Sequence, residues 1–155
     1  MRKALAGGVI WTILALLLCA RPLPAQSVPV RAELLEDGAY SSMLVTRVRE
    51  AKRRIICAFY LFKVQGGRGN LPAAIATELV RARNRGVEVT VILEGGETVG
   101  LENRAAASAL AQGGVRVLFP RRRRVTHTKG VVIDDRYVFI GSHNLTQSAL
   151  AHNNE

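Results

Sequence analysis

Cysteine is scarce in this sequence of 155 residues, which contains two, Cys19 and Cys57. Cys57 lies in the apolar segment IICAFYLF, where a lone cysteine usually serves as a small buried core residue. Two cysteines in these contexts offer neither a disulfide framework nor the paired spacing of a zinc ribbon. The fold therefore rests on its apolar core, which a chain of this length with 48% hydrophobic residues can supply.

Acidic and aromatic residues are also few. The 12 Asp and Glu residues stand against 22 Lys and Arg residues, which gives a formal net charge of +10. This excess favours anionic partners, namely nucleic acid, phosphorylated ligands or anionic lipid, and does not choose among them. Aromatic residues make up 5% of the chain. Base stacking therefore has little support, and binding to nucleic acid should be electrostatic, salt-sensitive and poor in sequence preference.

The longest apolar run, residues 4–20, follows Arg2 and Lys3 and precedes the segment RPLPAQS. A short basic region, an apolar stretch and an exit with small residues predict a secretory signal peptide. Cleavage is expected after Ala25, with Ala20 as the second choice. The protein is therefore expected to be secreted or periplasmic.

Two alternatives to a cleaved signal remain open. Residues 4–20 are just long enough to span a bilayer as an uncleaved anchor, which would be the protein's contact with a membrane. Lipid modification of Cys19 is less favoured, because Leu18 before it is bulkier than such sites usually take. Removal of residues 1–25 takes away three basic residues and no acidic one, so the net charge falls from +10 to +7. The basic character thus belongs to the expected folded domain, residues 26–155.

Alternating strand and helix patterns occupy the remaining chain. Continuous or alternating apolar residues predict strands, and apolar residues three or four apart predict helices. The expected strands are 28–35, 55–62, 87–93 and 115–119, followed by a hairpin of 130–134 and 137–141; the expected helices are 39–54, 71–85 and 101–112. This order predicts an α/β fold in which a mixed β-sheet is flanked by helices on both faces. Ligands are expected beyond the carboxyl ends of its strands.

Polar side chains stand at both ends of the hairpin, in the segment HTKGVVIDDRYVFIGSHN at 127–144. His127 and Lys129 are two residues apart, so on an extended strand they share a face. A fixed ammonium stabilises anionic oxygens beside an imidazole that can attack phosphorus or transfer a proton. Ser142 and Asn144 follow the second strand, and a tight turn between the strands would bring them next to the first pair.

These residues resemble the signature of the phospholipase D superfamily. HTKGVVID at 127–134 matches its His-x-Lys-x4-Asp motif, GSHN at 141–144 matches Gly-Ser-x-Asn, and the tail AHNNE is similar to its downstream Asn-x-Glu element. The likeness covers residues 30–155 and implies the αβα sandwich of the family. A single motif copy is similar to the small bacterial secreted endonucleases of the superfamily, which form homodimers with one active site across a two-fold axis.

The resemblance implies a role for each residue of the motif. His127 of one subunit attacks phosphorus to form a phosphohistidine, and His127 of the partner subunit protonates the leaving oxygen and then activates water. Lys129 and Asn144 hold the non-bridging oxygens, and Ser142 supports that pocket. Glu155 hydrogen-bonds the imidazole and fixes its tautomer.

Other residues have less defined roles. Asp134 is implied to support the hairpin, with a direct catalytic role as the alternative. His143 occupies the variable position of GSHN, either as a solvent-facing loop residue or in contact with substrate. The run RRRR at 121–124 is either a solvated basic loop or a patch that grips the nucleic-acid backbone. The resemblance implies no metal and no cofactor, because paired lysines replace a Lewis acid.

The sequence also differs from the family pattern. Family members continue beyond the Asn-x-Glu element with another strand and usually a helix, whereas this sequence stops at Glu155. A fragment, or a sheet without one edge element, is therefore expected.

The sequence predicts a metal-independent phosphodiesterase that acts as a non-specific endonuclease on DNA, with RNA as a second substrate class. One alternative is a phospholipid hydrolase or phosphatidyltransferase, which would need an apolar acyl-binding surface that the sequence does not show. Another alternative is a catalytically silent basic module that binds nucleic acid.

Overall fold

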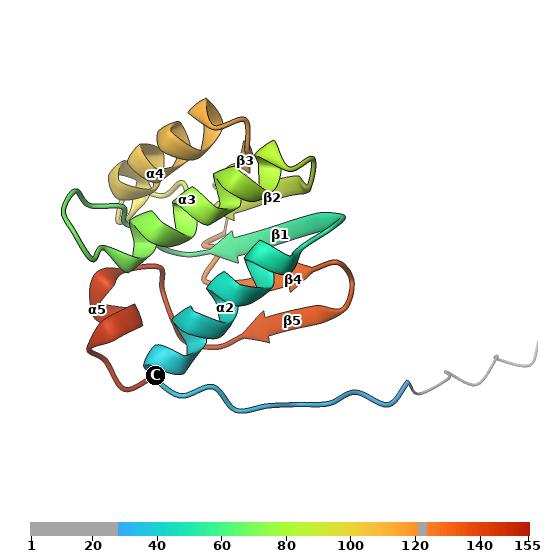
Figure 1. The fold of residues 1–155 in the computed structure, drawn as a ribbon. Helices are drawn as coiled ribbons and strands as arrows, with labels where there is room; N and C mark the ends of the chain where they lie inside the picture. Colours follow the sequence, from blue (N-terminus) through green and yellow to red (C-terminus); the bar gives the residue numbers. More distant parts are fainter. Residues whose placement is uncertain (1–27, 121–123) are drawn as a thin grey trace, which may run out of the picture. The chain divides into compact units, whose positions relative to one another are not determined.

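A computed structural model describes residues 28–120 and 124–155 of the protein (Figure 1). Residues 34–155 form one compact unit. Its elements are α2 (Gly38–Glu50), β1 (Arg54–Phe59), α3 (Leu71–Asn84), β2 (Glu88–Leu93), α4 (Gly100–Gln112), β3 (Arg116–Leu118), β4 (Lys129–Ile133), β5 (Tyr137–Ile140) and α5 (Gln147–Ala151). The order of elements predicted from residue 39 onward is confirmed. None of the helices in the described ranges is both long and apolar enough to cross a bilayer.

The strand predicted at 28–35 is wrong. Residues 28–36 form neither helix nor strand, and Val28, Val30 and Leu34 are 76–88% exposed. Alternating apolar residues make a stable strand only where a neighbouring strand accepts their hydrogen bonds and a core covers one face. This segment takes part in no sheet pairing of the described structure, so its apolar pattern alone is not sufficient to form a strand.

In the described residues the sheet has five strands in the order β3-β2-β1-β4-β5. β1 pairs in parallel with β2, and β2 in parallel with β3, whereas β4 is antiparallel to both β1 and β5. The predicted mixed sheet of an α/β fold is thereby confirmed. Parallel neighbours need a crossover connection, which α3 provides between β1 and β2 and α4 between β2 and β3.

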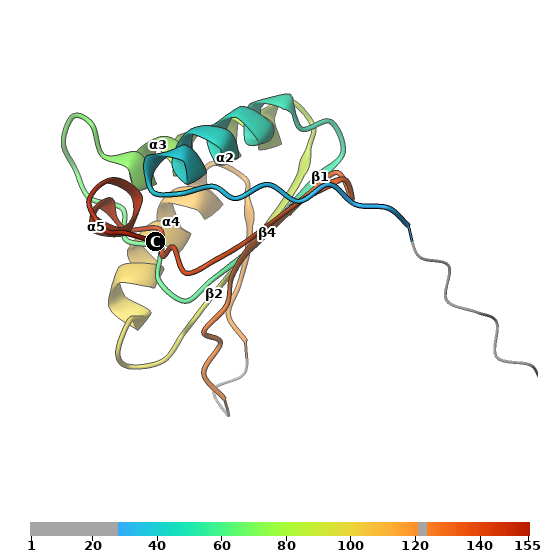
Figure 2. The ribbon, with the colours of Figure 1, turned by 90° about the horizontal axis from the view of Figure 1, so that it is seen from below.

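The helices cover one face of this sheet (Figure 2). Ile55, Cys57 and Phe59 of β1 point into the core beneath them and are at most 2% exposed. The crossovers from β1 to β2 and from β2 to β3 advance in the same direction, so right-handed connections place α3 and α4 on the same side. The second helical layer predicted for the opposite face is not seen in the described part of the chain. On that opposite face, the side chains of Val138 and Ile140 of β5 are 62% and 83% exposed.

α3 begins and ends at the residues that the sequence indicates. The Asn70 side chain accepts a hydrogen bond from the Ala73 amide at 2.9 Å, and Pro72 lies in the first turn. After Arg85, Gly86 has a φ of 91°, a left-handed conformation that ends the helix. These two ends set the length of the crossover that brings β2 beside β1.

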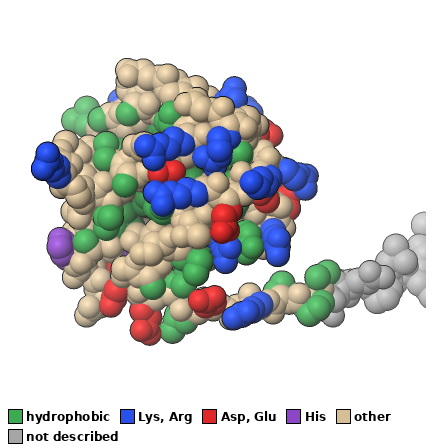
Figure 3. Space-filling model, in the orientation of Figure 1, with side chains coloured by type: hydrophobic (Ala, Val, Ile, Leu, Met, Phe, Trp, Pro, Cys, Tyr) green, Lys and Arg blue, Asp and Glu red, His purple; other side chains and the backbone are tan. Residues whose placement is uncertain are grey.

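Basic side chains gather on the face formed by α2 and α3 (Figure 3). Glu78 of α3 is 5% exposed, and its Oε1 accepts hydrogen bonds from Arg49 of α2 at 3.0 Å and from Arg81 at 2.8 Å. The hydrogen bond from Arg49 is the main reason that the pKa of Glu78 is lowered. A buried carboxylate thus joins the two helices through arginines that stay largely exposed.

The contact between α3 and the end of α4 yields a prediction about stability. A Cβ at Gly113 would lie 2.4 Å from Cγ2 of Val80. We predict that Gly113→Ala lowers the free energy of unfolding by about 1–3 kcal/mol, because the added methyl overlaps a packed side chain. Urea unfolding followed by far-ultraviolet circular dichroism measures this difference.

Gly66→Ala is the matched control, since a Cβ there would meet nothing within 4 Å. In the double variant, Val80→Ala should relieve the overlap, so the two changes together should cost less than the sum of each alone. A Gly113→Ala protein as stable as the Gly66→Ala protein would contradict the prediction.

Candidate active site

The candidate site starts with His127 and Lys129 at the beginning of β4. Lys129 is the first residue of the strand and is 9% exposed, whereas His127 is exposed just before it. Nζ of Lys129 lies 2.9 Å from Nδ1 and 3.2 Å from Nε2 of His127. The ammonium can therefore donate to whichever ring nitrogen lacks a proton. Burial lowers the pKa of Lys129, and the negative charge of Glu155 partly opposes this shift.

Tyr60 lies against this pair, and the sequence reasoning missed it. The residue follows β1, and its amide donates to the Thr128 carbonyl at 2.9 Å. Its ring centroid is 4.3 Å from that of His127 and 5.3 Å from Nζ of Lys129. The sequence places Tyr60 inside the strand expected at 55–62, whereas β1 ends at Phe59, and the residue therefore stands just beyond the strand, where α/β sheets bind ligands. Tyr60 thus forms one wall of the site.

The two ends of the hairpin meet, as its polar pattern predicts. The Gly141 amide donates to the Lys129 carbonyl at 3.4 Å. Beyond the hairpin, the Leu145 amide donates to the Leu61 carbonyl at 2.9 Å, and the Lys63 amide donates to the Leu145 carbonyl at 2.9 Å. The chain that follows β5 therefore runs beside the chain that follows β1, and this places the GSHN segment at the edge where the imidazole lies.

Ser142 and Glu155 contact each other directly. Oγ of Ser142 donates to Oε2 of Glu155 at 2.5 Å, and Nδ2 of Asn153 donates to Oε1 at 3.1 Å. The hydrogen bond from Ser142 is the main cause of the lowered pKa of Glu155, and the positive charge of Lys129 adds to it. The expected hydrogen bond from the His127 imidazole to the Glu155 carboxylate is not present in the described structure. The reason is that the tail folds back after α5, and Ser142 and Asn153 take up the carboxylate.

His143 is buried, so its interpretation as a solvent-facing loop residue is wrong. It is 3% exposed, and its ring stacks on Tyr40 with centroids 4.2 Å apart and an interplanar angle of 7°. A ring with so little exposed surface is also poorly placed to contact substrate. Nε2 of His143 and Oδ1 of Asn144 are buried and have no hydrogen-bond partner among the described residues. Asn144 therefore keeps a polar atom unsatisfied beside the site, which is unusual in a folded protein.

Asp134 lies at the other end of β4, away from the imidazole. Its carboxylate accepts hydrogen bonds from the amides of Lys52, Arg53 and Arg54 at 2.8–3.0 Å. Burial acts against ionisation, but these three bonds lower the pKa of Asp134 overall. Asp134 and Asp135 have φ values of 54° and 57°, as in a tight hairpin turn. Asp134 fastens this turn to the start of β1, about 16 Å from Lys129 along a five-residue strand, an arrangement that is consistent with the expected supporting role.

The basic run before His127 is only partly described. Arg121, Arg122 and Arg123 lie outside the described residues, and Arg124 has an exposed side chain. In the described ranges, no three His, Cys, Asp or Glu side chains come together as a group that could hold a metal ion.

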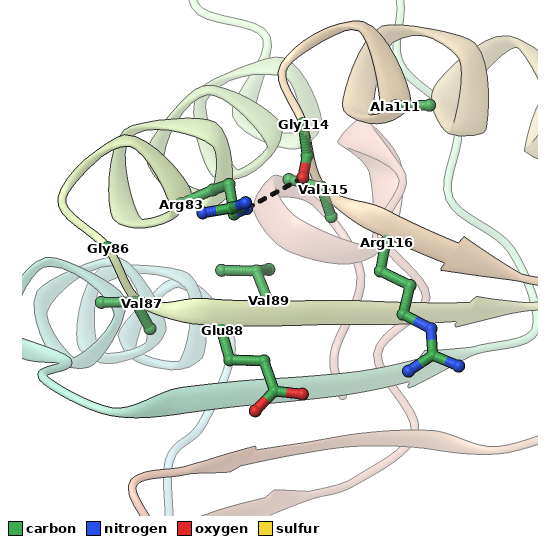
Figure 4. A pocket seen from close by; sticks show the side chains of 9 residues that line it. All are labelled: Arg83, Gly86, Val87, Glu88, Val89, Ala111, Gly114, Val115 and Arg116. Carbon is green, nitrogen blue, oxygen red and sulfur yellow. Dashed lines mark hydrogen bonds between the residues drawn. The ribbon is translucent and has the colours of Figure 1, made fainter.

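A surface hollow of about 440 Å³ lies at the start of β2 and β3 (Figure 4). Arg83, Glu88 and Arg116 line it, and Nε of Arg83 donates to the Gly114 carbonyl at 3.0 Å. In sheets of parallel strands, ligands bind at the carboxyl ends. His127 lies at that edge and the hollow lies at the opposite one, so the candidate site is the polar cluster around His127.

Comparisons with known proteins show the family to which this fold is similar. Residues 44–155 match the family model described as cardiolipin synthase, PLD-like domain. The structure is similar to that of a phospholipase D family member, Nuc from Salmonella typhimurium, with a TM-score of 0.64 and 25% sequence identity over 76% of this chain and 72% of that chain. It also resembles NucT from Helicobacter pylori, with a TM-score of 0.54 and 20% identity over 73% of this chain and 71% of that chain. No curated protein matches the chain.

The hydrogen bonds of Asp134 predict a loss of stability that depends on pH. Asp134→Asn should lower the free energy of unfolding by about 1–3 kcal/mol at pH 7, because a carboxamide cannot accept from all three amides. The folded pKa of Asp134 lies below its unfolded value, near 4, so the contribution is present above that value and is lost as pH falls through the folded pKa. Urea unfolding at pH 7 and at pH 3 should therefore give a smaller difference at pH 3.

Asp135→Asn is the control for this measurement. Its side chain is 40% exposed and pairs with Arg53 and Arg54 near the surface, so its loss should cost less than about 1 kcal/mol. Equal stability of wild type and Asp134→Asn at pH 7 would show that the carboxylate does not fasten the hairpin.

Proposed function

Because the chain belongs to the phospholipase D-like family, we propose that it is a metal-independent phosphodiesterase that cleaves nucleic acid as a non-specific endonuclease. The observation that carries this proposal is the contact between the exposed imidazole of His127 and the ammonium of Lys129, at 2.9 and 3.2 Å. A nucleophile that solvent can reach, beside a positive charge that burial holds in place, is suited to attack on a phosphodiester.

The proposed reaction has two steps. In the first, a ring nitrogen of His127 forms a bond to phosphorus, and the bond from phosphorus to the leaving oxygen breaks. The leaving oxygen takes a proton from His127 of the partner subunit. In the second, that imidazole removes a proton from water, the resulting hydroxide forms a bond to phosphorus, and the bond from phosphorus to the nitrogen of His127 breaks, which releases the phosphate product and frees the imidazole. Lys129 and Asn144 hold the non-bridging oxygens, whose negative charge grows in each transition state.

A second subunit would supply the second imidazole that the two proposed steps need. The chain has three histidines. His143 is buried against Tyr40, and His152 lies exposed at the end of α5. One chain therefore brings a single imidazole to Lys129, whereas the two steps need a nucleophile and an acid. We propose that two copies associate with their His127 side chains facing one phosphorus.

Charge supports nucleic acid as the substrate. The expected mature chain carries +7, from a total of +10 less three basic residues in 1–25, and the RRRR run at 121–124 directly precedes the site. A polyanion would be attracted by both. We also propose that the N-terminal segment directs export.

Phospholipid is the second candidate substrate, and one observation favours it. Val138 and Ile140 of β5 are exposed, and Ile140 pairs with Gly130, next to Lys129. These side chains could contact an acyl chain, which the sequence alone gave no reason to expect.

We predict that purified protein cleaves plasmid DNA in excess EDTA at the rate measured without chelator, because the proposed steps use imidazole and ammonium groups. His127→Ala should lower cleavage by at least about 1,000-fold without loss of folding, since the nucleophile is removed. Agarose gels and circular dichroism measure the two properties.

The same panel should include RNA and anionic liposomes. Release of lipid headgroup without cleavage of DNA would select the phospholipid hydrolase. Loss of cleavage in EDTA that added metal restores would refute the metal-independent mechanism. Salt-dependent DNA binding without any hydrolysis would identify a silent binding module.

A second prediction tests the shared site. When wild-type and His127→Ala subunits are mixed and allowed to exchange, activity should follow the square of the wild-type fraction. An equimolar mixture should thus keep about one quarter of the activity, because only wild-type pairs hold both imidazoles. Retention of about half would show that each subunit works alone.

A further inference from the structure

Glu94 is a buried carboxylate that follows β2 and belongs to none of the motifs in the sequence. It is 6% exposed. Oε1 accepts a hydrogen bond from the Gly96 amide at 2.7 Å, and Oε2 accepts one from the Thr126 amide at 2.6 Å. The bond from Thr126 is the main cause of the lowered pKa of Glu94. The side chain is therefore a charged acceptor, and each of its oxygens is engaged by the backbone.

The backbone of Glu94 is itself held in place. Asn103 of α4 is fully buried, and its Nδ2 donates to the carbonyls of Tyr60 at 2.8 Å and of Glu94 at 2.7 Å. Its Oδ1 accepts from the Phe62 amide at 2.8 Å. One side chain thus ties together the chain segments that follow β1 and β2. Glu94 stands on a fixed support, so its carboxylate can set the position of what it binds.

Glu94 binds the segment that carries His127, the proposed nucleophile. The described part of the connection from β3 to β4 is fastened on both sides of His127: the Thr126 amide binds Glu94, and the Thr128 carbonyl accepts from the Tyr60 amide at 2.9 Å. Lys129 Nζ also donates to the His127 carbonyl at 3.2 Å. Removal of the first bond would leave the Thr126 amide without a hydrogen-bond acceptor in the described structure.

We propose that Glu94 is a positioning residue, whose carboxylate fixes the Thr126 backbone so that the imidazole of His127 meets Lys129 and the substrate phosphorus in line. This inference rests on the proposed phosphodiesterase function. Glu94 does not act on the substrate, because both of its oxygens are taken by amides and its side chain is buried. A displaced nucleophile slows the chemical step and leaves substrate binding largely intact.

Glu94→Gln is the test variant, since it keeps the shape of the side chain and turns one acceptor into a donor that faces an amide. Glu78→Gln is the matched control, because Glu78 is a carboxylate of similar burial, 5% exposed, that binds arginines on the helix layer instead. Steady-state cleavage of a small phosphodiester and of DNA is measured in both, together with urea unfolding.

The expected result is a fall in kcat of about 100-fold in Glu94→Gln with KM within about threefold of wild type. Glu78→Gln should keep the wild-type kcat even where it loses as much stability. If Glu94→Gln does not fold, Glu94→Asp replaces it, since the shorter carboxylate keeps the charge and loses reach to Thr126. Unchanged kcat, a loss confined to KM, or an equal loss of kcat in Glu78→Gln would each overturn the proposal.

Hydrogen exchange separates this proposal from the proposed function. The Thr126 amide should exchange at least about tenfold faster in Glu94→Gln than in wild type, with no change in Glu78→Gln. If wild-type protein cleaves no phosphodiester, the proposed function fails. Exchange of the Thr126 amide then still shows whether Glu94 holds the backbone of this segment. If wild type is active and the Thr126 amide exchanges equally fast in wild type and in the variant, the positioning role is refuted while the function stands.

Discussion

β1 has a parallel neighbour on one side and an antiparallel neighbour on the other, and the site depends on this arrangement. Its register pairs Cys57 with Val91 of β2 and with Val131 of β4. Because β4 runs in the opposite direction, its first residue, Lys129, lies at the edge where β1 and β2 end. A parallel β4 would have brought Asp134 to this edge in its place. The antiparallel pairing of β4 with β1 thus brings His127 and Lys129 to the edge at which sheets with parallel strands usually bind ligands.

That edge is also where buried polar groups are concentrated. Glu94, Asn103, Lys129 and His143 are all at most 9% exposed, and burial of such groups is costly unless hydrogen bonds compensate. Asn103 satisfies three backbone groups and Glu94 two. These bonds satisfy backbone groups of the loops that follow the strands. Apolar side chains of the core cannot do this, because they offer no hydrogen-bond donor or acceptor. The edge is therefore rigid where the proposed reaction needs fixed geometry, and it is polar because regular pairing stops there.

Much of this could be predicted from sequence, and the exceptions have physical causes. Helix caps such as Asn70 are local, and the contact of His127 with Lys129 follows from strand alternation. The expected strand at 28–35 is wrong because its apolar pattern carries no information about a pairing partner. Asn103 was not foreseen, since its partner Tyr60 lies 43 residues away, and no local pattern indicates such a contact. His143 was misjudged because the inward turn after Gly141 depends on the bridge between Phe62 and Leu145.

The exposed face of β5 has a consequence for how the protein behaves in solution. Val138 and Ile140 stand on a strand that is paired on one side in the described structure, and such an edge can pair with another chain. The strand has only four residues and follows the charged turn of Asp135 and Arg136, features that limit edge-to-edge association. The excess of basic over acidic residues adds long-range repulsion between molecules. Added salt screens that repulsion and leaves the apolar attraction in place, so colloidal stability should be greatest in buffers of low ionic strength.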